Sequence, residues 1–156
     1  MWKISILTLS IFLFISLFTV FRSNKKENTG AQEKGIFNEN GFGLSLTANK
    51  GIYKEGEAIE LALKVFNYSK DNIIFNFKDG QRYDFIIENE EEEKVWQWSQ
   101  GKMFTMALGR EILGPDNREI VYKENYSGKL KPGNYKITGI FTSMERMMGS
   151  IEITVK

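Results

Sequence analysis

The chain has 156 residues, of which 42% are hydrophobic, enough for one domain with its own packed core. Its 21 Lys and Arg residues nearly balance its 20 Asp and Glu residues, so the formal net charge is +1 and no nucleic-acid-binding surface is indicated. The chain contains no Cys and no His. Disulfides, imidazole bases, Cys nucleophiles and zinc sites built from these ligands are therefore excluded.

The first predicted element is a membrane helix. Residues Ile4 to Phe21 form an apolar run without a charge, bounded by basic residues on both sides. A bilayer core of about 30 Å needs roughly 17 to 25 apolar helical residues, so the run is long enough to span it. Residues 1–22 are therefore predicted to be a transmembrane helix or signal anchor. The alternative is a cleaved secretory signal, although Val20 and Phe21 are bulky where signal cleavage needs small residues.

The basic residues on the two sides of this run nearly balance, so they do not decide its orientation. An apolar N-terminal helix before one folded domain most often serves export. We therefore expect a single-pass protein of the cell membrane with its domain outside the cytoplasm, or a secreted domain if the run is cleaved. Residues 23–35 are polar and are predicted to be a flexible linker, and residues 36–156 are predicted to form the folded domain.

The domain is predicted to be all-β, because short alternating runs rich in Val, Ile, Phe, Tyr and Thr follow one another between turn residues. Their spacing is typical of an antiparallel β-sandwich. Asp79-Gly80 is predicted to close a hairpin between the third and fourth strands. The predicted strands are Leu44 to Ala48, Ile59 to Phe66, Ile73 to Phe77, Tyr83 to Glu88, Lys94 to Ser99, Arg118 to Lys123, Asn134 to Phe141 and Gly149 to Val155.

Several short motifs of the domain are shared with one protein family. They are Gly80-Gln81-x-Tyr83-Asp84-Phe85, Val95-Trp96-x-Trp98-Ser99, Lys102-x-Phe104-Thr105 and Gly133-x-Tyr135. In this order they resemble the BsuPI family, which takes its name from an intracellular proteinase inhibitor of Bacillus. The resemblance covers most of residues 44–153, and Met106 stands where the family pattern leads us to expect Gln. It implies an immunoglobulin-like β-sandwich and inhibition of a subtilisin-type serine protease.

The aromatic residues of these motifs are candidate partner-binding residues. Tyr and Trp combine a large contact area with a polar tip and are frequent at interface hot spots. Tyr83, Trp96, Trp98 and Phe104 could form such a surface, or they could pack between the sheets as core residues. Asp84 lies between apolar neighbours and points to the opposite face of its strand, where a capping or turn-binding role fits it better than chemistry.

The stretch from Gln100 to Pro115 is the longest without a sustained strand pattern, and it is more apolar than a loop requires. We expect it to be a loop that contacts a partner, with Met103, Phe104 and Met106 as candidate contact residues. A protease inhibitor must present an extended, supported backbone to the enzyme cleft, and a long loop on a sandwich can do so. The alternative is that these apolar residues plug one end of the sandwich.

The sequence thus predicts a binding protein rather than an enzyme, with a protein partner and without a cofactor or metal. The Met residues are predicted to be adaptable packing residues. The acidic run from Glu88 to Glu93 is predicted to be a solvated hairpin tip. The leading hypothesis is a membrane-tethered relative of the BsuPI inhibitor that acts on a subtilisin-like serine protease. The alternative is a non-inhibitory structural or adhesive module of the bacterial cell envelope.

Overall fold

A computed structural model describes residues 30–37, 41–115 and 118–156. Within these residues the chain forms eleven strands and no helix, which confirms the prediction of an all-β domain. The strands are β1 (Gln32–Phe37), β2 (Phe42–Ala48), β3 (Ile52–Tyr53), β4 (Ile59–Asn67), β5 (Ile73–Phe77), β6 (Tyr83–Glu88), β7 (Lys94–Gln97), β8 (Gly109–Leu113), β9 (Glu119–Tyr126), β10 (Gly133–Phe141) and β11 (Met147–Val155).

The predicted membrane helix, residues 1–22, lies outside the described residues. Among the residues that are described, there is no helix with the length and apolar character needed to cross a membrane.

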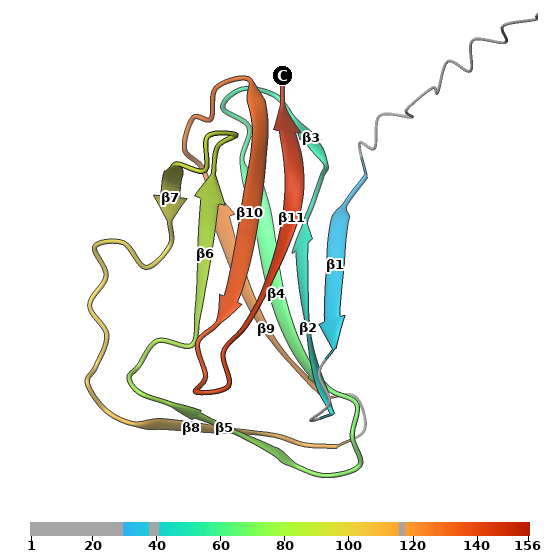
Figure 1. Ribbon diagram of the computed structural model, residues 1–156, viewed down its shortest axis with the longest axis vertical. Helices are drawn as coiled ribbons and strands as arrows, with labels where there is room; N and C mark the ends of the chain where they lie inside the picture. Colours follow the sequence, from blue (N-terminus) through green and yellow to red (C-terminus); the bar gives the residue numbers. More distant parts are fainter. Residues whose placement is uncertain (1–29, 38–40, 116–117) are drawn as a thin grey trace, which may run out of the picture.

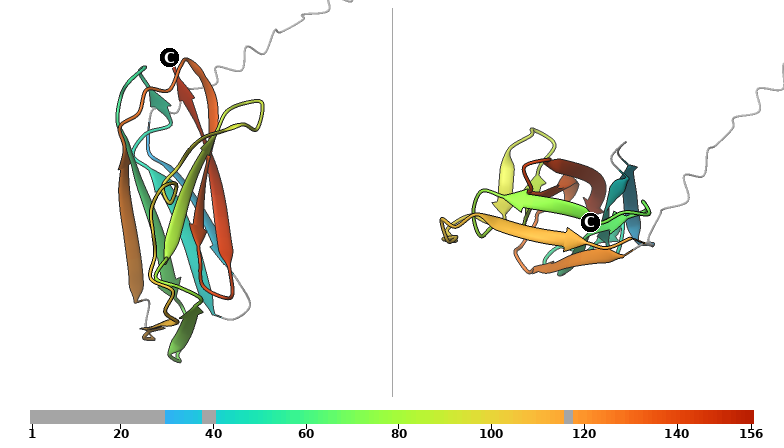
Figure 2. Two further views of the ribbon diagram at one scale, coloured as in Figure 1. Left: turned by 90° about the vertical axis from the view of Figure 1, so that its left-hand side faces the viewer. Right: turned by 90° about the horizontal axis from the view of Figure 1, so that it is seen from below.

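Two sheets pack face to face, with a third small sheet across one end (Figures 1 and 2). The four-stranded sheet has the order β1-β2-β4-β9, and the five-stranded sheet has the order β3-β11-β10-β6-β7. Neighbouring strands are antiparallel except β3, which runs parallel to β11. The third sheet is the antiparallel pair β5-β8.

The core lies between the two large sheets, because the apolar residues alternate along their strands and face inward. Leu46 of β2 and Leu63 of β4 are fully buried and face Gly139 of β10. A Cβ atom at Gly139 would lie 2.8 Å from Leu63 and 2.9 Å from Leu46. The glycine therefore allows the sheets to approach closely at this point.

Aromatic side chains fill the end of the core beneath the β5-β8 pair. Phe141 of β10 makes edge-to-face contacts with Phe75 and Phe77 of β5, at centroid distances of 4.9 and 5.4 Å. Phe75 makes the same kind of contact with Phe42 of β2 at 4.9 Å. These buried rings join the small sheet to both large sheets, in the geometry that aromatic pairs favour.

Every predicted strand exists, with bounds that differ by a few residues at most. The predicted linker, residues 23–35, overlaps β1, which begins at Gln32, four residues before the predicted start of the domain. The pattern of β1 is mainly polar, and the strand is held by its antiparallel pairing with β2 and by a 2.8 Å hydrogen bond from Ser45 to Glu33. Both supports depend on a partner strand, which the pattern of β1 itself does not indicate.

Two other predictions are corrected. The hairpin predicted around Asp79-Gly80 is wrong, since β5 pairs with β8 while β6 pairs with β10 and β7. The loop predicted from Gln100 to Pro115 is interrupted by β8. Both errors have one cause, because the chain leaves the small sheet after β5, forms β6 and β7 in the large sheet, and then returns to pair β8 with β5.

Candidate functional site

The connection between β7 and β8 leaves the edge of the five-stranded sheet and runs to the small sheet at the end of the molecule (Figure 1). It begins with a turn from Trp98 to Gly101, in which the amide of Lys102 donates a 3.0 Å hydrogen bond to the carbonyl of Ser99. Gly101 has a φ of 76°, which glycine adopts without strain. Residues 102–106 then continue without turn or bend. We call residues 102–108 the presenting loop.

The presenting loop turns large apolar side chains into solvent. Met103 is 98% exposed, Met106 is 93% exposed and Leu108 is 81% exposed. Phe104 points the other way and contacts Trp98 at a centroid distance of 5.9 Å. Exposed apolar groups gathered on one segment contribute little to folding and are typical of a surface that binds another protein.

Asp84 fixes the start of the connection. Its side chain is buried, with 4% of the residue exposed, and its two oxygens accept hydrogen bonds from β7 and the turn that follows it. Ser99 donates through its amide at 3.0 Å and through Oγ at 2.6 Å, and Gln97 donates through Nε2 at 2.6 Å. Asp84 is therefore a turn-binding residue that positions the chain as it leaves β7.

Trp98 is the platform beneath the first part of the presenting loop. Its ring contacts Tyr83 at 4.2 Å between centroids, and the ammonium group of Lys102 lies 3.6 Å from its ring centroid. Tyr83 in turn stacks on Tyr122 of β9 at 4.5 Å and donates a hydrogen bond to Glu124. The platform therefore connects the loop to the four-stranded sheet.

Gly80 holds the middle of the presenting loop. Its amide donates a 2.8 Å hydrogen bond to the carbonyl of Thr105. A Cβ atom at Gly80 would lie 2.5 Å from Oγ1 and 3.2 Å from the amide nitrogen of Thr105. Glycine thus permits this close approach, because a Cβ atom would push against the side chain and the backbone of Thr105.

Arg82 secures the far end of the connection at β8. Its Nε lies 2.7 Å from Oε1 of Glu111, and its guanidinium group lies 4.2 Å from the ring centroid of Phe77. Tyr122 donates a 3.2 Å hydrogen bond to the other oxygen of Glu111. A Cβ atom at Gly109 would overlap the guanidinium group, so this glycine makes room for it.

Two tyrosines of this network have perturbed acidity. Burial raises the pKa of Tyr83 well above its ordinary value of 10, and the hydrogen bond to Glu124 raises it further. Burial also raises the pKa of Tyr122, and the charge of Glu111 acts in the same direction. Both hydroxyl groups therefore remain protonated donors over the whole neutral range.

The structure divides the seven predicted site residues into three groups. Met103 and Met106 are presented to solvent. Tyr83, Asp84 and Trp98 support the presenting loop, and Phe104 anchors the loop to Trp98. Trp96 lies apart, half-buried against Tyr126 at a centroid distance of 5.1 Å.

Sequence reasoning missed two supporting residues, Gly80 and Arg82. Both lie within three residues of Tyr83, and residues 80–84 together hold the connection at its start, middle and end. We call residues 80–84 the bracing segment. The position of this segment inside the motif was the available signal, but its contacts are made to the presenting loop and to β8, both distant in sequence.

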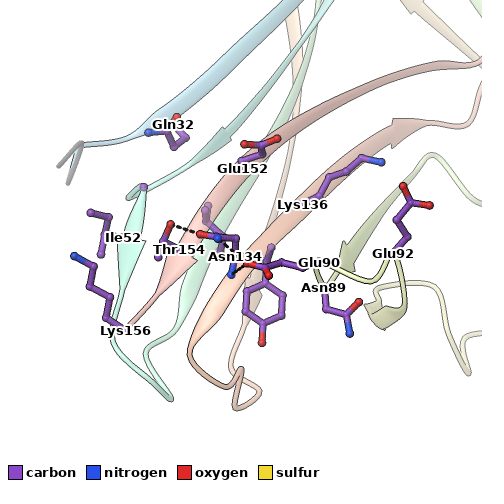
Figure 3. Close-up of a pocket in the computed structure, with 13 residues that line it drawn as sticks. Gln32, Ile52, Asn89, Glu90, Glu92, Asn134, Lys136, Glu152, Thr154 and Lys156 are labelled. Carbon is purple, nitrogen blue, oxygen red and sulfur yellow. Dashed lines mark hydrogen bonds between the residues drawn. The ribbon is translucent and has the colours of Figure 1, made fainter. Parts of the chain in front are cut away.

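A surface groove of about 750 Å³ lies away from this site, along β10 and β11 (Figure 3). Asn134 donates a 2.6 Å hydrogen bond to Glu90 and accepts a 2.8 Å hydrogen bond from Thr154. These polar side chains therefore satisfy one another. Over the parts of the chain that the structure covers, no three acidic, His or Cys residues are grouped to hold a metal ion.

A family model described as intracellular proteinase inhibitor, BsuPI, matches residues 46–146. The matched segment contains the whole bracing segment, the platform and the presenting loop. No curated protein matches the chain.

Solved structures with similar chains show low sequence identity. The C-terminal domain of Wzt is 12% identical, with a TM-score of 0.48, and the match covers 81% of this chain and 78% of that one. A β-glucosidase from Erythrobacter marinus is 10% identical, with a TM-score of 0.42, and the match covers 81% of this chain but 16% of the glucosidase. The CARDB domain of a Pyrococcus furiosus protein is 12% identical, with a TM-score of 0.39 and coverages of 81% and 90%. No conclusion about binding or catalysis follows from these similarities.

The first prediction concerns Asp84. In the variant Asp84→Asn, an amide donor replaces one carboxylate oxygen and faces the donor of Gln97, so a buried hydrogen bond is lost. We expect a decrease of about 1–3 kcal/mol in the free energy of unfolding, measured by urea denaturation. We also expect faster amide hydrogen exchange at Ser99 and across the presenting loop. Unchanged exchange in the loop would contradict the positioning role of Asp84.

The second prediction concerns the alkaline limit of stability. The folded pKa of Tyr83 lies above the value of about 10 for an unfolded tyrosine, so the folded chain holds this proton more tightly. The contribution of Tyr83 to the free energy of unfolding is fully present below about pH 9 and is lost as the pH rises above about 10. The variant Tyr83→Phe should therefore show a shallower loss of stability above pH 10 in urea denaturation. Parallel curves for the two proteins would contradict this assignment.

Proposed function

This chain belongs to the BsuPI family, described as intracellular proteinase inhibitors, and we propose on this premise that it is itself a proteinase inhibitor. A protein partner of the proteinase class follows from the family. We propose a serine protease of the subtilisin type as the target, and the presenting loop as the segment that enters its cleft.

The observation that carries this proposal is that the presenting loop is exposed to solvent and is also held in place by the rest of the domain. Met103 and Met106 are almost fully exposed, while the bracing segment and the platform hold the backbone around them. A proteinase binds its substrate as an extended chain, so an inhibitor gains affinity when such a chain is already fixed before binding. The fixed backbone also reduces the entropy lost on association.

We also propose that the domain is an immunoglobulin-like sandwich. The order β3-β11-β10-β6-β7 opposite β2-β4-β9 corresponds to the usual arrangement of such a fold, with β1 as an additional strand. Tyr135 near the start of β10 donates a 2.9 Å hydrogen bond to the carbonyl of Lys131, four residues upstream. This contact resembles the tyrosine corner that many of these sandwiches contain.

The third prediction tests inhibition directly. We expect the purified full-length chain to inhibit subtilisin in a steady-state assay with a fluorogenic peptide. The variant Gly80→Ala should inhibit at least about tenfold more weakly, because its Cβ atom displaces the presenting loop from its fixed position. The matched control is Gly35→Ala on β1, where the nearest atom to the new Cβ lies at an ordinary 3.5 Å.

The control variant should inhibit like the parent protein. Full activity of subtilisin at high molar excess of the parent chain would refute inhibition of this protease type. Crosslinking in cells that recovers an envelope protein and no proteinase would then favour the alternative, a non-inhibitory structural or adhesive module. Equal inhibition by the parent and Gly80→Ala chains would show that inhibition does not depend on the fixed position of the presenting loop.

We further propose that the domain is tethered to the cell membrane through residues 1–22 and lies outside the cytoplasm. The support for this placement is the apolar run from Ile4 to Phe21 in the sequence.

The fourth prediction tests this placement with a tag at the C-terminus of the full-length chain. Protease added to intact cells should destroy the tag, with a cytoplasmic protein as the protected control. A tag that survives until the cells are permeabilised would place the domain in the cytoplasm, and an extracellular proteinase could then not be its target.

A further inference from the structure

Met103 differs from the other exposed residues of the presenting loop because both of its neighbours are anchored. The ammonium group of Lys102 lies 3.6 Å from the ring centroid of Trp98, and Phe104 contacts the same ring at 5.9 Å. The residues on either side of Met103 are thus tied to one platform. Met103 itself points away from this platform and is 98% exposed.

Met106 and Leu108 lack this arrangement. Met106 follows Thr105, which is held by Gly80, but it precedes a bend at the exposed residue Ala107. Leu108 follows the same bend and is the last residue before β8. Each of these side chains is therefore anchored on one side only, so its position is less well fixed than that of Met103.

The backbone around Met103 is also free to pair with an enzyme. Among the hydrogen bonds of the described residues, none involves the amide or carbonyl group of Met103 or Phe104. No turn or bend interrupts the chain from residue 102 to residue 106. A proteinase cleft binds its substrate by pairing with such free backbone groups while a pocket receives one side chain.

We propose that Met103 enters the primary specificity pocket of the target proteinase and sets which proteinases the chain inhibits. This inference rests on the proposed function and adds the contact residue and the proteinase class. Methionine is long, unbranched and uncharged, so the pocket that receives it is apolar and deep enough for an unbranched side chain. Proteinases whose pocket carries an acidic group for Lys or Arg are excluded as targets of the parent chain.

The experiment compares four variants of the purified full-length chain against subtilisin and trypsin. Met103→Ala should weaken inhibition of subtilisin at least about tenfold, because a residue buried in a pocket acts as a hot spot. Met106→Ala is the matched control, equally exposed and of the same chemistry, and should change inhibition by less than about threefold. Met103→Lys should create inhibition of trypsin, whereas Met106→Lys should not.

The outcomes separate this inference from the proposed function. If the parent chain does not inhibit subtilisin but Met103→Lys alone inhibits trypsin, the proposed target fails and the role of position 103 stands. If the parent chain inhibits subtilisin and Met106→Ala weakens it as much as Met103→Ala does, the inference is overturned while the proposed function stands. Denaturation curves of the four variants should coincide with the parent curve, because neither exposed side chain supports the fold.

Discussion

A carboxylate that is removed from water is costly unless its oxygens are hydrogen-bonded, and Asp84 meets this requirement only when the chain beyond β7 takes one path. The amide and hydroxyl groups of Ser99 and the amide group of Gln97 supply the donors. The direction in which the connection leaves the sheet is therefore coupled to the satisfaction of a buried charge. The position of Trp98, and with it the platform for the presenting loop, follows from this constraint.

The remaining supports act on the same connection from the same short segment. Gly80 holds Thr105, and Arg82 pairs with Glu111 on the strand that ends the connection. The bracing segment is itself fixed, because its last two residues begin β6, an interior strand of the five-stranded sheet. A loop of this length would lose considerable entropy on binding a partner. Here the loop loses most of this conformational entropy when the domain folds, so little is left to lose when a partner binds.

Much of the fold could be predicted from the sequence, because strands buried on one face alternate with a period of two. The role of Asp84 as a turn-binding residue also followed from its apolar neighbours. The small strand β8 could not be predicted, since it pairs only with β5 and its residues carry no clear alternation. The contacts of Gly80 and Arg82 could not be predicted for a related reason, because Gly80 contacts Thr105 in the presenting loop and Arg82 contacts Glu111 on β8, both distant in sequence.

Along the connection between β7 and β8, the exposed residues differ from the bracing residues in what a substitution would change. Met103 and Met106 make almost no contact with the rest of the domain, so a substitution there alters the surface offered to a partner without a large loss of stability. No packing constraint holds either residue there. A change at Asp84 or Gly80 would instead disturb the backbone that presents these side chains. The fold therefore constrains the bracing segment, whereas the exposed residues above it can be substituted at little cost in stability.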